Sequence, residues 1–181
     1  MIRCLRRAAL FVVLAVMAGC NASSSSTSQS SDDMPKHTVQ KFLEAVKAGN
    51  QEAAGMMLTA VARKKTAEID CVVAPPGSET ATFKLGQVET VSPTVAHVQS
   101  FWTDKEEDGT AHTDEIVWLT RRDPEGWRIS GMATRVYDGQ VPVMLNFEDP
   151  QDMLRRQEAA EKEIARRAQP STEEKPAAVT R

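Results

Sequence analysis

The residues best suited to acid–base chemistry are two histidines and an aspartate near the middle of the chain. His112 and Asp114 are two positions apart, so both side chains lie on one face if this segment is an extended strand. His97 lies in the strand-like segment that comes before them. A histidine beside a carboxylate can serve as a general base because it titrates near neutral pH.

The context of this pair favours a structural interpretation. The charged run 105–109 comes directly before it, so the strand only enters the sheet near His112 and the pair is expected to be exposed. We identify no third group that would complete a catalytic site, and the prediction is that the protein is not an enzyme. Three histidines without ligand spacing predict no metal site and no cofactor.

Large apolar side chains could line a ligand pocket. The candidates are Trp102, Trp118, Phe101 and Met132. Side chains of this kind more often belong to the ordinary core, and both interpretations stay open from the sequence.

The amino terminus contains the most specific motif of the chain. A basic segment (1–7) and a short apolar segment (8–16) precede Met17-Ala18-Gly19-Cys20. This order resembles the lipobox of bacterial lipoproteins, and the alternative is an ordinary cleaved signal with a chance cysteine. The resemblance implies a signal peptide over 1–19, a lipid on Cys20, and anchoring to a cell-envelope membrane that faces the periplasm or the exterior. Asn21, in place of aspartate, favours the outer membrane.

Cysteine content and charge narrow the possibilities further. Cys4 would be removed with the signal peptide, so Cys71 would be the only unmodified cysteine and no intrachain disulfide is expected. The net charge of the chain is −3, and loss of the three arginines in residues 1–19 would make it −6. A nucleic-acid partner is therefore not expected.

Helical periodicity follows a serine-rich tether that covers residues 20–33. Apolar residues at i, i+3, i+4 and i+7 predict a first helix from Asp33 to Gly49, and Asn50 caps a second helix that runs to about Lys65. At the other end, Asp149 and Pro150 start a charged helix to about Ala168. The tail 169–181 is expected to be disordered.

Alternating periodicity predicts strands over 80–91 and 94–103 and a hairpin over 114–136. The turn Asp123-Pro124-Glu125-Gly126 is typical of a three-residue loop closed by a bulge at Gly126. Pairing Asp123 with Trp127 then places Leu119 opposite Gly131, where the missing side chain indicates a bend or close approach. The segment 141–147 is expected to lie extended along the sheet.

Two helices followed by a four-stranded antiparallel sheet resemble the nuclear transport factor two-like superfamily. The segment Val39–Asn50 is similar to the opening helices of small secreted members, and Gly126-Trp127-Arg128-Ile129 resembles the start of their final strand. The resemblance implies a cone-shaped α+β domain, assigned to residues 34–148, with a curved sheet and a cavity between sheet and helices. The charged helix over 149–168 is appended to this domain. The resemblance transfers no activity.

Three functions are compatible with these observations. The first is a membrane-tethered envelope lipoprotein whose non-catalytic domain binds a small apolar ligand or a protein partner. The second is a small cofactor-independent hydro-lyase or isomerase that acts in the cone cavity. The third is a structural envelope protein that docks a partner through the helix 149–168.

Overall fold

A computed structural model describes residues 33–73, 77–106, 108–135 and 141–168. The signal peptide, the tether up to residue 32 and the tail 169–181 lie outside these residues. The elements are α1 (Asp33–Lys47), α2 (Gln51–Met56), α3 (Ala60–Ala67), β1 (Thr82–Ser92), β2 (Val95–Lys105), β3 (Ala111–Asp123), β4 (Gly126–Thr134), β5 (Val143–Asn146) and α4 (Pro150–Ala168). The α+β class and the C-terminal helix are confirmed.

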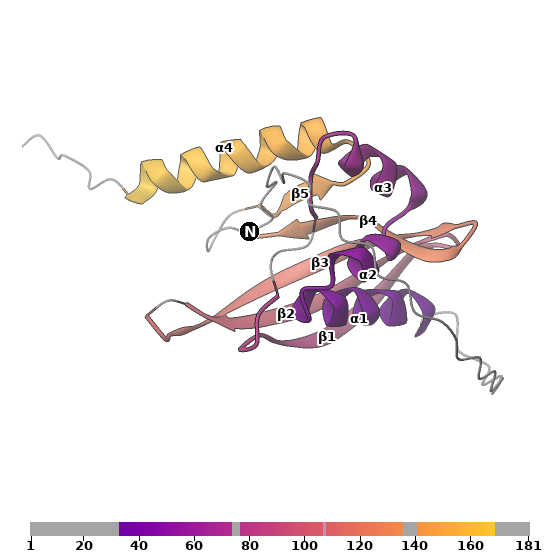
Figure 1. Cartoon of the computed structure of the whole chain (residues 1–181), viewed down its shortest axis with the longest axis horizontal. Coiled ribbons are helices and arrows are strands. Elements are labelled where there is room, and N and C mark those ends of the chain that lie inside the picture. Colours follow the sequence, from indigo (N-terminus) through magenta and orange to yellow (C-terminus); the bar gives the residue numbers. More distant parts are fainter. Residues whose placement is uncertain (1–32, 74–76, 107, 136–140, 169–181) are drawn as a thin grey trace, which may run out of the picture.

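The sheet has five antiparallel strands in the order β1-β2-β3-β4-β5. Four were predicted, and the fifth is the apolar segment that was expected only to lie along the sheet. Figure 1 shows α1 and α2 across one face of the sheet, while α4 lies beside β5.

The core lies between α1 and the covered face of the sheet. Val39, Phe42, Leu43 and Val46 recur with helical spacing and are all buried. The Phe42 ring meets the Trp118 ring edge-on, with 4.9 Å between centroids. The Trp118 indole N–H donates to the Ser100 Oγ at 2.9 Å, so its polar group is satisfied inside the core.

The predicted second helix is wrong in one respect, because two shorter helices occupy its place. Between them Leu58 forms a parallel bridge with Ile129 at the edge of β4. The Thr59 N–H donates to the Ile129 carbonyl and the Ile129 N–H donates to the Met57 carbonyl, both at 2.9 Å. These backbone bonds to a distant strand replace helical bonds, so the helix ends at Met56 and a new one begins at Ala60.

The register of the β3–β4 hairpin is confirmed away from the turn and is wrong near it. Leu119 pairs with Gly131 as expected, but Asp123 pairs with Gly126 rather than with Trp127. The register shifts by one between Leu119 and Thr120, which leaves Ser130 as the extra residue. The bulge therefore lies inside β4, where the Ser130 carbonyl accepts the N–H of Phe147 at 2.9 Å.

The close approach expected at Gly131 is confirmed. A Cβ added there would lie 2.6 Å from the Leu145 carbonyl oxygen and 3.2 Å from Leu119 Cδ1. Gly126 has φ +104°, a conformation that suits glycine at the turn.

Cys71 is disulfide-bonded in the structure, which contradicts the expectation that no intrachain disulfide forms. The expectation assumed that Cys4 is removed and that the Cys20 sulfur is acylated.

Candidate ligand-binding cavity

A cavity of about 280 Å³ lies between α2, α3 and the segment 71–73. It is open to solvent on one side, and Phe42 on α1 contributes to its wall. Its lining is mainly apolar, with polar side chains from both short helices. The lining residues are Phe42, Gln51, Glu52, Ala54, Gly55, Met56, Leu58, Arg63, Thr66, Cys71, Val72 and Val73.

The wall formed by α2 depends on the break after Met56. The Asn50 side chain caps this helix by accepting the Ala53 N–H at 3.0 Å. Gly55 lies in the last turn, and a Cβ added there would meet no atom within 4 Å. A side chain added at Gly55, which is one of the lining residues, would therefore meet no steric clash at its Cβ.

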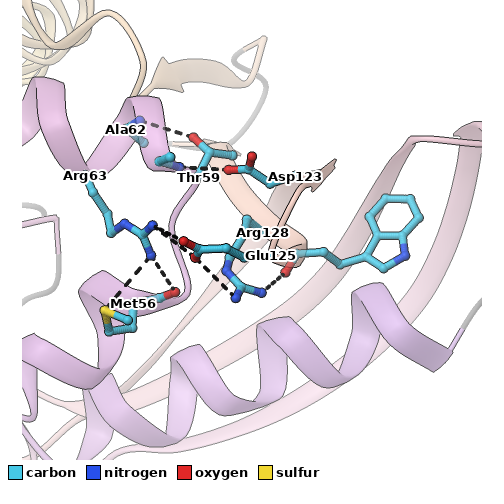
Figure 2. Close-up of polar contacts among 9 residues, drawn as sticks. Met56, Thr59, Ala62, Arg63, Asp123, Glu125 and Arg128 are labelled. Carbon is cyan, nitrogen blue, oxygen red and sulfur yellow. Dashed lines mark hydrogen bonds and ion pairs between the residues drawn. The ribbon is translucent and has the colours of Figure 1, made fainter.

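The wall formed by α3 is held by the turn of the β3–β4 hairpin (Figure 2). Thr59 caps this helix by accepting the Ala62 N–H at 3.1 Å, and Asp123 accepts the Ala60 N–H at 2.8 Å. From the second turn, Arg63 reaches the Glu125 carboxylate at 3.0 Å. The same carboxylate lies 3.6 Å from the Arg128 guanidinium, so two cations share one anion beside the cavity.

None of the four predicted pocket residues lines this cavity. Trp118 and Met132 are buried in the core. Trp102 is half-buried and stacks on Phe83 with 6.2 Å between ring centroids. Phe101 lies on the opposite face of the sheet and is 36% exposed.

Local sequence signals could not have revealed the cavity. Its opening depends on the Leu58–Ile129 bridge, which joins residues far apart in the chain. Gly55, a weak helix former inside the expected second helix, was the one local hint.

The three candidate residues for acid–base chemistry do not converge. The His112 Nε2 and Asp114 Oδ1 atoms are 3.2 Å apart, but the side chains are 63% and 43% exposed. His97 lies on the opposite face of the sheet, where its Nδ1 is 3.6 Å from Glu89 Oε2. The described geometry therefore places an exposed pair at one end of β3 and a separate pair on the other face.

Asp104 is the most extensively hydrogen-bonded acid near His112, and the two residues pair across β2 and β3. Its Oδ1 accepts from Thr80 Oγ1 at 2.6 Å, from Ser78 Oγ at 2.9 Å and from the Lys105 N–H at 2.8 Å. The Thr80 hydroxyl is the largest cause that lowers the pKa of Asp104 below its ordinary value. These hydrogen bonds hold the segment before β1 against the end of β2, so the Asp104 carboxylate has a structural role.

The described part of the chain contains neither a metal-binding cluster nor a membrane-spanning helix. No three histidine, cysteine or acidic side chains there lie close enough together to hold a metal ion. None of the described helices has the length and apolar character needed to span a membrane.

No known protein family matches the sequence, and no curated protein matches it either. Two solved structures are similar to this chain. One is a ketosteroid isomerase-like protein from Erwinia carotovora atroseptica SCRI1043, with 17% identity over 54% of this chain and 89% of that one, and a TM-score of 0.42. The other is an NTF-2 like protein of unknown function from Shewanella oneidensis MR-1, with 16% identity over 54% and 92%, and a TM-score of 0.36. At these identities no function is taken from either structure.

Proposed function

We propose that this chain is a lipoprotein of the bacterial cell envelope whose folded domain binds a small apolar ligand in the cavity between α2 and α3. The main support for the binding function is the cavity itself. Its volume of about 280 Å³ is close to the lower end of the range for small-molecule sites. Its walls combine Phe42, Leu58 and Val73 with a few polar groups, which is the usual composition of such sites.

Titration with 2-naphthylmethanol, a neutral two-ring compound, tests the binding function. We expect saturable chemical-shift changes in the methyl groups of Leu58 and Val73 when the compound enters the cavity. Gly55→Leu should abolish these changes, because the new side chain projects into open space at the cavity without a steric clash. Ala67→Leu places the same leucine side chain at an exposed position of α3 outside the lining, and should bind like the wild type.

Two results would count against the proposal. If the wild-type protein shows no saturable change at Leu58 or Val73, the cavity does not bind apolar ligands. If Gly55→Leu binds as tightly as Ala67→Leu, the compound binds elsewhere.

The membrane tether is proposed from the sequence motif that ends at Cys20. Each buried CH₂ of an acyl chain contributes roughly 0.8 kcal/mol to membrane affinity. Cys20→Ser should therefore release the protein from the membrane fraction, while Ser24→Ala in the tether should leave it bound. Mass spectrometry of the mature N-terminus should find a lipid thioether, whereas a disulfide at Cys20 would exclude the assignment because it uses the same sulfur. Asn21, in place of aspartate, favours the outer membrane, which membrane fractionation tests.

A hydro-lyase or isomerase is the second candidate function. The 3.2 Å contact between His112 Nε2 and Asp114 Oδ1 favours it, because a histidine beside a carboxylate can act as a general base. The high exposure of both side chains argues against it, since general bases work best where bulk water is excluded. We therefore place ligand binding first.

A further inference from the structure

We propose that the cavity between α2 and α3 selects small aromatic or short aliphatic carboxylic acids over their neutral counterparts, and that Arg63 binds the carboxylate. This inference rests on the proposed binding function and adds the chemical class of the ligand. It follows from the position of Arg63 in the cavity wall and from how its donors are used.

Arg63 belongs to the lining, and its side chain is 24% exposed. A guanidinium carries five N–H donors in a planar fork. Both oxygens of Glu125 lie near the same nitrogen, Nη2, at 3.1 and 3.0 Å. This is not the bidentate arrangement in which two nitrogens each meet one oxygen, so the edge that includes Nη1 keeps most of its donor capacity.

The contacts of Nη1 are long. Figure 2 shows it directed at Met56, another lining residue, with 3.4 Å to the carbonyl oxygen and 4.0 Å to Sδ. Strong N–H···O hydrogen bonds are about 2.9 Å long. A carboxylate oxygen in the cavity could replace these weak contacts by a charge-assisted hydrogen bond.

The two acids beside Arg63 differ in how a ligand carboxylate would compete with them. Glu125 is the carboxylate shared by Arg63 and Arg128, and it is 50% exposed. Asp123 is close by, but its Oδ2 accepts the Ala60 N–H at the start of α3. A ligand carboxylate on the cavity side of Arg63 would be less hydrated than Glu125, which strengthens its attraction to the guanidinium.

The remaining lining orients the ligand. Apolar side chains of the same lining suit a ring or a short alkyl chain; they are Phe42, Ala54, Leu58, Val72 and Val73. Glu52 is the acidic member of the lining and lies one helical turn before Met56, about 6 Å along α2. Its repulsion favours a carboxylate at the Arg63 end of the cavity.

The test compares 2-naphthoate with 2-naphthylmethanol, which have the same ring system and differ in charge. A charge-assisted hydrogen bond at a partly buried site should make the acid bind about tenfold more tightly than the alcohol. Arg63→Met removes the guanidinium and keeps an apolar stem, so the acid-to-alcohol ratio should fall to about one. Arg122→Met removes one positive charge from an exposed position outside the lining and should keep the wild-type ratio.

Glu125→Gln is the second variant, and it still tests the carboxylate assignment if Arg63→Met does not fold. It removes the anion that competes for Arg63, so the acid should bind roughly two- to fivefold more tightly while the alcohol is unaffected. If the alcohol binds wild-type protein and the acid binds no better, the carboxylate assignment is wrong although the cavity binds ligands. A ratio in Arg63→Met equal to that of Arg122→Met, or no gain in Glu125→Gln, also overturns it. If neither compound binds, the proposed binding function itself fails.

Discussion

Gly131 offers the sharpest test of how the sheet is assembled, through the change Gly131→Ala. The added Cβ would lie 2.6 Å from the carbonyl oxygen of Leu145 on β5, a distance that real Cβ contacts do not show. The clash is with backbone, so rotation of a side chain cannot relieve it and β5 must move away from β4. We estimate the cost at about 3 kcal/mol, from about 2 for overpacking and about 1 for a weakened β4–β5 hydrogen bond. For a domain of this size that corresponds to a fall in Tm of roughly 10 °C.

Gly55→Ala is the matched control, since it makes the same chemical change where the new Cβ meets nothing within 4 Å. A glycine in a helix costs about 0.5–1 kcal/mol relative to alanine, so this variant should be slightly more stable than wild type. Thermal melts by circular dichroism and urea unfolding would measure both. If Gly131→Ala melts within about 2 °C of Gly55→Ala, the β4–β5 packing described here is wrong.

Three further predictions concern other parts of the fold. Gly126→Val should lower the unfolding free energy by about 2 kcal/mol, because φ is +104° at the turn and a β-branched residue is strained there; urea denaturation that matches wild type would contradict it. Met153→Ala should cost about 2–4 kcal/mol in the same assay, because this fully buried side chain docks α4, whereas the exposed-site control Leu154→Ala should cost much less. Hydrogen bonds, from Thr80 above all, lower the pKa of Asp104, so its contribution to stability is present above the unfolded value near 3.8 and is lost as the pH falls through the lower folded value. The Tm of Asp104→Asn should therefore depend less steeply on pH in this range than that of the wild type, and parallel curves would refute the assignment.

Local sequence pattern was sufficient for most of the fold. Alternating periodicity placed the strands, and the register inferred from the turn paired Leu119 with Gly131 correctly. It could not locate the bulge. Asp123-Pro124-Glu125-Gly126 fits more than one loop length, and the extra residue falls at Ser130, where Phe147 donates to its carbonyl.

The candidate site could not be predicted for a related reason. A helical pattern ran through Met57–Thr59, and only the backbone groups of Ile129 interrupt it. Residue type alone indicated the pocket candidates, and type does not distinguish a side chain that lines a cavity from one that fills the core. Trp118 belongs to the second kind, because Phe42 and Ser100 occupy its surroundings.

The edge of β4 has a consequence for the timing of folding. The segment 57–59 lies beside Ile129, and β5 lies beside residues 131–134, so the two ends of the domain meet on one strand. The Thr38 hydroxyl donates to the Trp127 carbonyl and the Thr59 hydroxyl donates to Glu148, and each of these bonds joins residues 89 positions apart. During synthesis these contacts with β4 and Glu148 therefore cannot form until the last third of the domain has been made. A chain whose closing contacts join residues so far apart folds slowly and as a whole.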